Sequence, residues 1–372
     1  MRVIFTGGGT GGHIYPIMAL IERLKERKLV TNDEILFVGT KKGLESKIVP
    51  AAGVPFETLN VQGFDRRHIF KNFETVKLFL DATKQARKII DQFKPDIVVG
   101  TGGYVCGAMV YEAAKMKIPT LIHESNSVVG LANKFLAHYV DKICYTFDDA
   151  AKQFSEKKKL VKTGNPRSQQ VLGLNEEKVD IQKKWDLNPE VPTVLIFGGS
   201  RGALAINKIV LKSLDELEQK PYQVIWATGQ LYYGEIKKKL AGKKINSNVK
   251  IVPYIDNMPG LLPQMTCVVS RSGATSLAEF TALGVPVILI PSPNVTHNHQ
   301  YKNAMDMEKA GAALVIAEDD LNPNNFVSSI DHILLDREYA KKMSEASKKL
   351  GVPDASDQVI SVMQELVKDK VK

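Results

Sequence analysis

Short, continuously apolar runs alternate along this chain with longer segments whose apolar residues recur at helical spacing. The runs predict strands over residues 3–6, 35–38, 96–100, 119–123, 142–146 and 159–163, and a second series over 193–197, 223–227, 249–254, 267–270, 286–290 and 313–317. A strand that is apolar throughout is typical of a parallel sheet with helices on both faces. The pattern therefore predicts an α/β fold.

The two series of strands share one plan. "VIFTGGGTGGH" at residues 3–13 opens the first, and "VLIFGGSRGA" at 194–203 opens the second; each predicts strand, glycine loop and helix. We therefore expect two Rossmann-like domains that face one another across a cleft. Because Gly164, Asn165 and Pro166 interrupt the pattern, the predicted domains are 1–164 and 165–353. A last helix over about 354–372 either stays with the second domain or packs back on the first.

The net charge of +9 is concentrated in the first domain. Residues 1–164 hold 25 Lys and Arg against 17 Asp and Glu, whereas the remaining residues hold 25 against 24. A basic domain indicates an anionic partner, which leaves nucleic acid, a membrane surface or an acidic substrate open. The three cysteines lie far apart in apolar segments, which favours reduced, buried thiols over a metal site.

The opening loop matches the dinucleotide pattern G-x-G-x-x-G at Gly7, Gly9 and Gly12. A nicotinamide-binding domain also needs an acidic residue at the end of the second strand, and this strand ends "VGTKKG". An oxidoreductase is therefore disfavoured. His13 follows the glycines and either flanks the helix or acts as a general base, since the positive helix end favours the neutral imidazole.

A second candidate loop is "SRSGATSLAEF" at residues 270–280. Ser276-x-x-Glu279 fits a capping box, in which Glu279 has only a structural role. Alternatively, the first helical turn binds a diphosphate and Glu279 accepts hydrogen bonds from the vicinal hydroxyls of a ribose. Glu124 ends the fifth predicted strand and is a second candidate base. The two histidines of "HNHQ" do not share a helix face, so a metal pair is not expected.

Seven motifs in one order carry a resemblance to a known family: "GGGTGGHIYP", "HESNSVVGLANK", "GNPR", "GGSRGA", "YIDNM", "SRSGATSLAE" and "HNHQYKNA". Together they resemble the MurG family of bacterial peptidoglycan N-acetylglucosaminyltransferases. The resemblance implies a GT-B fold and inverting transfer of N-acetylglucosamine from UDP-N-acetylglucosamine to the muramyl 4-hydroxyl of lipid I. Lipid II and UDP would be the products. A related transferase with another lipid acceptor, such as diacylglycerol, is the alternative.

The matching motifs imply roles for individual residues. The loop of residues 10–12 would face the sugar and the acceptor, Asn126 and Gln300 would contact the sugar, and Ile255 would hold uracil through its backbone. Arg167 and Ser200 would meet the diphosphate region, and Glu279 the ribose. The complete implied donor site is Thr10, Gly11, Gly12, Asn126, Arg167, Ser200, Ile255, Ala274, Thr275, Ser276, Leu277, Ala278, Glu279 and Gln300.

An inverting transfer needs a base that deprotonates the acceptor hydroxyl as it attacks. His13 is the first candidate and Glu124 the second. Helix N-termini and Arg167 could stabilise the departing UDP. The chain has no Asp-x-Asp motif, so we expect a site with neither metal nor cofactor.

A lipid acceptor requires contact with the membrane, and residues 66–88 form a basic, amphipathic stretch. Such a helix can rest on anionic lipid, although an apolar stripe can equally be core packing. The basic first domain favours a peripheral membrane surface over core packing, and we expect a position at the cytoplasmic face of the membrane. A non-catalytic membrane or nucleic-acid binding protein would also use the basic domain, but it leaves the paired glycine loops unexplained. The predicted membrane surface consists of Arg66, Arg67, Ile69, Phe70, Lys71, Phe73, Val76, Lys77 and Leu80.

Overall fold

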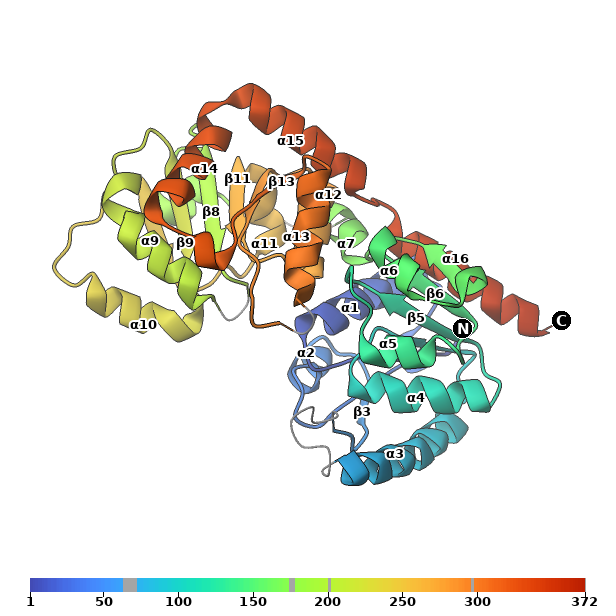
Figure 1. The fold of residues 1–372 in the computed structure, drawn as a ribbon. Helices are drawn as coiled ribbons and strands as arrows, with labels where there is room; N and C mark the ends of the chain where they lie inside the picture. Colours follow the sequence, from blue (N-terminus) through green and yellow to red (C-terminus); the bar gives the residue numbers. More distant parts are fainter. Residues whose placement is uncertain (63–71, 174–177, 200–201, 296–297, 372) are drawn as a thin grey trace. The chain divides into compact units, whose positions relative to one another are not determined.

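The computed structural model describes residues 1–62, 72–173, 178–199, 202–295 and 298–371, with backbone alone for 72–76, 173 and 371. The chain forms two compact units (Figure 1). Unit 1 comprises Met1–Gln170 together with Val352–Lys372, and unit 2 comprises Val171–Gly351.

Unit 1 is built on a seven-stranded parallel sheet with the order β3-β2-β1-β4-β5-β6-β7. Its strands are β1 (Val3–Thr6), β2 (Ile35–Gly39), β3 (Phe56–Thr58), β4 (Ile97–Gly100), β5 (Thr120–Glu124), β6 (Lys142–Tyr145) and β7 (Leu160–Lys162). Chain connections reverse direction between β1 and β4. Loops at the carboxyl ends of these two strands therefore lie where an open α/β sheet binds ligands.

Helices cover both faces of this sheet (Figure 1). Val3 and Phe5 of β1 face a core formed with α1 (Gly11–Glu26), α2 (Glu45–Ala51) and α16 (Ala355–Val371). Ile4 faces the opposite core, formed with α3 (Asn72–Phe93), α4 (Tyr104–Lys115) and α5 (Leu131–Leu136). Burial of successive residues on opposite faces explains why the strands are apolar without alternation. Shorter helices are α6 (Asp148–Gln153) and α7 (Arg167–Gly173).

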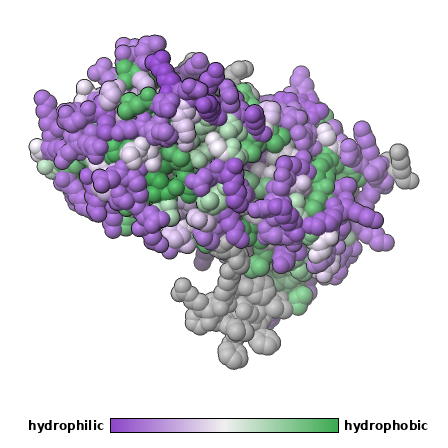
Figure 2. Space-filling model, turned by 45° about the horizontal axis from the view of Figure 1, so that its top comes forward, coloured by the Kyte–Doolittle hydropathy of each residue, from purple (hydrophilic) through white to green (hydrophobic). Residues whose placement is uncertain are grey.

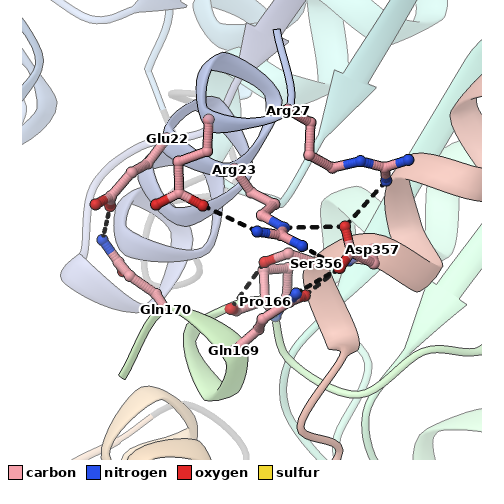
Figure 3. A network of polar contacts seen from close by, with 9 residues as sticks. Glu22, Arg23, Arg27, Pro166, Gln169, Gln170, Ser356 and Asp357 are labelled. Carbon is pink, nitrogen blue, oxygen red and sulfur yellow. Dashed lines mark hydrogen bonds and ion pairs between the residues drawn. The ribbon is translucent and has the colours of Figure 1, made fainter. Parts of the chain in front are cut away.

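The C-terminal helix α16 packs on α1 within unit 1 and is fixed there by polar contacts (Figure 3). The Asp357 carboxylate accepts two hydrogen bonds from the Arg23 guanidinium, at 2.7 and 3.0 Å, and one from Arg27 at 2.9 Å. Gln169 donates to the same carboxylate and accepts from the Asp357 N–H. The last helix therefore lies with the first unit.

The boundary between the units lies at Gln170, later than the predicted residue 164. Gly164 and Pro166 do interrupt the helical pattern, but the segment stays attached to unit 1. The Gly164 carbonyl bonds His123 Nε2 at 2.8 Å, and the Pro166 carbonyl accepts from Ser356 Oγ at 3.0 Å. A local break in periodicity marks the end of an element, whereas tertiary contacts decide which unit a segment joins.

Unit 2 repeats the plan with a six-stranded parallel sheet in the order β10-β9-β8-β11-β12-β13. Its strands are β8 (Thr193–Phe197), β9 (Gln223–Ala227), β10 (Val249–Val252), β11 (Cys267–Ser270), β12 (Val287–Leu289) and β13 (Ala313–Val315). One face packs against α9 (Leu204–Leu217), α10 (Gln230–Lys239), α14 (Pro323–Leu335) and α15 (Arg337–Leu350). The remaining helices are α8 (Ile181–Trp185), α11 (Met258–Leu261), α12 (Ala274–Leu283) and α13 (His299–Lys309).

Every predicted strand is present, and the predicted α/β class with two parallel sheets is confirmed. Strand β3 was not predicted, because this edge strand is partly exposed and lacks a continuous apolar run. The three cysteines are buried free thiols, as expected. Among the described residues, no helix combines the length and apolar character needed to cross a bilayer.

Candidate active site

The opening glycine loop places His13 in the first turn of α1. Strand β1 ends at Thr6, Gly9 adopts a left-handed conformation with φ +85°, and α1 begins at Gly11. The His13 N–H donates to the Thr10 carbonyl at 3.1 Å, and the side chain is half-buried. The positive end of the helix dipole is therefore close to this imidazole.

A second glycine loop, after β4, supports the first. Thr101 Oγ1 donates to the His13 carbonyl at 2.6 Å, and the Gly8 N–H donates to the Gly102 carbonyl at 3.3 Å. Gly102 has φ +111°, and a Cβ added there would lie 2.7 Å from His13 Cε1. Gly103 has φ +88°, and its added Cβ would lie 2.6 Å from the Gly8 carbonyl oxygen. Sequence reasoning had not connected these residues to His13.

Glu45 also joins the opening loop, and sequence reasoning missed it. Its fully buried carboxylate accepts the Gly9 N–H at 3.0 Å, the Thr40 N–H at 2.9 Å and the Thr40 hydroxyl at 2.6 Å. Glu45 belongs to α2 and not to the end of the second strand, but its carboxylate lies next to Thr40, the residue that follows that strand. However, this carboxylate bonds the protein's own loop, so it does not restore a ribose-binding site for a nicotinamide cofactor.

Glu124, the second candidate base, is buried and saturated with hydrogen bonds. Oε1 accepts from the N–H and the side-chain amide of Asn126 at 3.0 and 3.4 Å. Oε2 accepts from the Gly130 N–H at 3.0 Å and from Asn133 Nδ2 at 2.9 Å. These bonds make Glu124 the anchor of the loop that carries Asn126, which favours His13 as the base.

His123, beside Glu124, is fully buried and bridges two segments of unit 1. Its Nε2 lies 2.8 Å from the Gly164 carbonyl, and its Nδ1 lies 3.2 Å from Ser125 Oγ. Since the carbonyl can only accept, Nε2 carries the proton and Nδ1 accepts from the serine. Burial lowers the pKa of His123, which keeps the ring neutral. His123 is thus a structural link.

Arg167 was predicted to join the second domain at the nucleotide diphosphate, but the structure places it in unit 1. Its guanidinium lies over the Tyr15 ring, with 5.7 Å to the ring centroid, and donates to Gln170 at 2.5 Å. Its N–H bonds Asn165 Oδ1 at 3.1 Å. Tyr15 belongs to the same helix as His13. The cation therefore lies beside the opening of α1.

In unit 2, the capping box predicted at Ser276 and Glu279 is absent. Helix α12 begins at Ala274 with Gly273 as its N-cap, and no side chain caps it. Ser276 is therefore inside the helix, and Glu279 lies one turn further along with 7% of its surface exposed. The capping-box interpretation of Glu279 is therefore wrong, and its contact with a ribose stays a prediction.

The residues around the start of α12 are held by contacts with α13. Ser272 Oγ donates to the Gln300 carbonyl at 2.7 Å, and Asn303 Nδ2 donates to the Ser272 carbonyl at 3.2 Å. Gln300 Oε1 accepts the Ser292 N–H at 2.9 Å. Among the described residues, the buried Thr275 Oγ1 has no hydrogen-bond partner. This uncapped turn therefore offers N–H groups and a hydroxyl to an anion.

Other predicted donor residues follow two further strands of the second sheet, β10 and β8. Ile255 follows β10, and its side chain is buried with 3% exposed, so backbone groups are what it can offer a ligand. The loop after β8 contains Gly199 and Gly202 with φ +84° and +77° and leads to an N-terminus of α9 without a side-chain cap. Ser200 lies outside the described residues. The remaining predicted residues are in α12: Leu277 and Ala278, both buried.

Most of the predicted membrane surface lies outside the described residues: Arg66, Arg67, Ile69, Phe70 and Lys71. The side chains of Phe73 and Val76 are also not described. Lys77 is exposed, and Leu80 is 55% exposed. Further along α3, Ala82, Ala86 and Ile90 are buried in the core. The apolar stripe is therefore core packing from Ala82 onward, whereas Leu80 faces outward.

No group of three or more His, Cys, Asp or Glu side chains within the described ranges could hold a metal ion. The expected metal-free reaction remains a prediction that this observation does not test.

Comparisons with known proteins agree with this architecture. The model of the glycosyltransferase family 28 N-terminal domain matches residues 3–145, and that of the C-terminal domain matches residues 193–359. The chain is 86% identical over 370 residues, covering all of both chains, to a protein of Lactobacillus johnsonii named UDP-N-acetylglucosamine--N-acetylmuramyl-(pentapeptide) pyrophosphoryl-undecaprenol N-acetylglucosamine transferase. A protein of Limosilactobacillus reuteri with the same name is 51% identical over the full length of both chains.

Among solved structures, MurG of Acinetobacter baumannii matches with a TM-score of 0.77 and 25% identity, over 98% of this chain and 99% of that one. An S. aureus MnaA structure with UDP has a TM-score of 0.70 at 18% identity, over 97% and 95% of the two chains, and supports the fold alone. The architecture is that of GT-B glycosyltransferases. Two family domains, full-length relatives and a shared fold agree: the chain belongs to glycosyltransferase family 28, among its MurG N-acetylglucosaminyltransferases.

Proposed function

We propose that this protein transfers N-acetylglucosamine from UDP-N-acetylglucosamine to the muramyl 4-hydroxyl of lipid I, forming lipid II and UDP. The observation that carries the proposal is the 86% identity, over the whole chain, to the L. johnsonii protein named for this transfer. Transfer to another lipid acceptor such as diacylglycerol remains the alternative, because the donor site would be common to both enzymes.

Unit 2 is proposed to bind the donor. The first turn of α12 would receive the diphosphate, because its N–H groups have no side-chain cap and the Thr275 hydroxyl lacks a partner among the described residues. Glu279 would accept hydrogen bonds from the ribose hydroxyls, Ile255 would bind uracil through its backbone, and Gln300 would contact the sugar. Ser200 would meet the diphosphate.

Unit 1 is proposed to supply the base and the acceptor-side loop. His13 would take the proton of the muramyl 4-hydroxyl while that oxygen attacks the anomeric carbon. The bond from this carbon to the diphosphate oxygen breaks in the same step, so the configuration inverts. The negative charge that develops on UDP would be stabilised by the N-terminus of α12, with Arg167 as a further cation. Asn126 and residues 10–12 would contact the sugar.

A peripheral position at the cytoplasmic face of the membrane is also proposed. Phe79, Tyr111, Phe135 and Tyr139 form an aromatic cluster across α3, α4 and the end of α5, with neighbouring ring centroids 4.9–6.1 Å apart. Phe135 and Tyr139 are 39% and 46% exposed. The face displayed in Figure 2 is mostly hydrophilic and is interrupted by hydrophobic residues. Exposed aromatic side chains on a basic domain suit an anionic lipid surface.

The transfer is tested with purified protein, UDP-N-acetylglucosamine and a short-chain lipid I analogue. We expect UDP release that depends on the acceptor, and a disaccharide product with inverted configuration. A parallel reaction with diacylglycerol tests the alternative acceptor. If UDP were released with diacylglycerol but not with the lipid I analogue, the acceptor would be diacylglycerol and not lipid I. If neither acceptor caused UDP release, the proposed transfer would be refuted.

Membrane binding is tested with vesicles containing anionic lipid. The double variant L80S/F135S should bind them more weakly than the wild type. The control L231S changes a leucine of unit 2 that is 75% exposed and should bind normally. If L80S/F135S bound the vesicles as strongly as the wild type does, Leu80 and Phe135 would not be part of a membrane-binding surface.

A further inference from the structure

Glu45 has no role in the proposed chemistry, yet it is a fully buried carboxylate directly beneath the opening loop. It is the first residue of α2, and its two oxygens accept three hydrogen bonds from two separate loops. One bond comes from the Gly9 N–H, and two come from Thr40 at the end of β2. Burial of a charged carboxylate costs free energy that its hydrogen bonds must offset. The bonds to the two loops are therefore what holds Glu45 in this position at the carboxyl edge of the sheet.

The space around this carboxylate exists because three neighbouring positions are glycines. A Cβ on Gly8 would lie 2.5 Å from Glu45 Oε1, and a Cβ on Gly39 would lie 2.6 Å from Glu45 Cγ. A Cβ on Gly43 would also collide with the carboxylate. One glycine of the opening loop, Gly8, and two at and after the end of β2, Gly39 and Gly43, thus leave room for a protein carboxylate.

The carboxylate is charged when it makes these bonds. Burial alone would raise the pKa of Glu45, but the hydrogen bonds from Thr40 and Gly9 bring it below its ordinary value. The first turn of α1 itself holds no acidic residue. Glu45 of α2 therefore places a negative charge next to the loop that precedes α1, where the first turn of α1 has none of its own.

The position of Gly9 links Glu45 to His13. Gly9 has φ +85°, and only Thr10 separates it from the start of α1. Because the first turn of α1 carries His13, a bond that fixes Gly9 also fixes the start of the helix and the direction of the imidazole. Thr101 and Gly102 hold His13 from the other side.

We propose that Glu45 is a positioning residue for glycosyl transfer: through the Gly9 N–H, it holds the opening loop so that His13 meets the acceptor hydroxyl. This inference rests on the proposed function. It assigns Glu45 no contact with either substrate. A bonded carboxylate at this N–H also disfavours a phosphate group at the same place, because two anions would compete for one donor.

The experiment compares Glu45→Gln with Glu112→Gln. Gln places a donor where the carboxylate accepts only, so one bond to Gly9 or Thr40 is lost. Glu112 is a matched control, because it is 5% exposed, lies in the same unit and accepts from Arg87 at 3.3 Å. Thr40→Val and Thr40→Ser provide a second pair that removes or keeps the hydroxyl donor to Glu45.

Three quantities are measured for each variant: kcat with the lipid I analogue, amide hydrogen exchange across residues 7–13, and the melting temperature. We expect E45Q and T40V to lower kcat about tenfold or more, since small misplacements of a catalytic group are costly. Exchange across residues 7–13 should be faster in both variants. E112Q and T40S should match the wild type in both kcat and exchange.

A merely structural Glu45 would lower the melting temperature without lowering kcat of the folded enzyme, and this result would overturn the proposal. Unchanged exchange across residues 7–13 together with reduced kcat would also overturn it, because the effect would then not pass through the loop. Failure of the proposed function gives a different result: the wild type itself would lack acceptor-dependent transfer. Faster exchange in E45Q would then still establish that Glu45 fixes the loop.

Discussion

The imidazole of His13 lies directly against Gly102. A Cβ added to Gly102 would be 2.7 Å from Cε1 and 2.9 Å from Nδ1 of the ring, and the glycine has φ +111°. The ring therefore uses the space that the absent side chain leaves. A glycine in the loop after β4 fixes a side chain at the start of α1.

Gly102→Ala should displace His13. We expect kcat to fall about tenfold or more, because the ring must move from its position in the loop. Steady-state kinetics with the lipid I analogue measures this loss, and calorimetric titration of UDP-N-acetylglucosamine should show unchanged donor affinity.

Gly53→Ala is the matched control for this change. Gly53 also has positive φ, at +69°, but no atom lies within 4 Å of its added Cβ. Both variants carry a backbone cost of about 1–3 kcal/mol, whereas only G102A meets the imidazole. If G53A and G102A reduced kcat equally, backbone strain rather than displacement of His13 would explain the loss.

His13 and Glu124 can be separated by the pH dependence of kcat. His13→Ala should lower kcat by about 10²–10⁴-fold and remove the basic group from the profile. Glu124→Gln should leave the shape of the profile unchanged and lower thermal stability, since its carboxylate accepts four hydrogen bonds from the following loop and from α5. Protonation of the base produces the low-pH limb of the profile. Loss of this limb in E124Q, with the limb retained in H13A, would exchange the two roles.

Glu279 should recognise the ribose of the donor. The wild type is expected to bind UDP about 10–100 times more tightly than 2′-deoxy-UDP, because a hydrogen bond to a charged acceptor contributes about 1.5–3 kcal/mol. Glu279→Ala should lose this preference, and titration calorimetry measures both ligands.

Ser276→Ala adds a test of the local structure. A capping box would make this change destabilise the protein by about 1 kcal/mol. Because Gly273 is the N-cap of α12 and Ser276 lies inside the helix, we expect little change in melting temperature.

For Glu279→Ala, a preference for UDP over 2′-deoxy-UDP that persisted in the variant would mean that another part of the protein binds the ribose.

The strands could be predicted because a strand that is buried on both faces has a continuous run of apolar residues in the sequence. Val3, Ile4 and Phe5 are all buried although their side chains point to opposite cores. Phe56–Thr58 lacks such a run, because it is an edge strand with exposed residues. The fold class could therefore be predicted from the local pattern, whereas the short edge strand β3 is recognised only from its pairing with β2.

The candidate site could be predicted only in part, since its residues are joined by contacts far apart in sequence. Glu45 looks like an ordinary acidic residue at a helix start until Gly8 and Gly39 are seen around it. The Ser-x-x-Glu pattern at Ser276 was misleading because a four-residue motif does not fix where its helix begins. Arg167 was assigned to the wrong unit because chain order does not show which segment it packs against.

The contact between Asp357 and Arg23 predicts a pH-dependent contribution to the stability of unit 1. Hydrogen bonds from Arg23 lower the pKa of Asp357 from 3.8 to about 2. A carboxylate with a lowered pKa in the folded state stabilises fully above its unfolded pKa. This stabilisation is lost as the pH falls from about 4 toward about 2, where the folded state also becomes protonated.

Asp357→Asn should therefore destabilise the protein by about 1–2 kcal/mol at pH 7 and pH 5, and progressively less at pH 4 and pH 3. Urea denaturation at these four pH values, followed by far-ultraviolet circular dichroism, measures the difference from the wild type. Asp354→Asn is the control, because the exposed Asp354 carboxylate accepts a hydrogen bond from Gln358 in the same segment. We expect D354N to follow the wild type throughout. A D357N deficit that persisted undiminished at pH 3 would mean that shape, rather than the charge of Asp357, attaches α16 to α1.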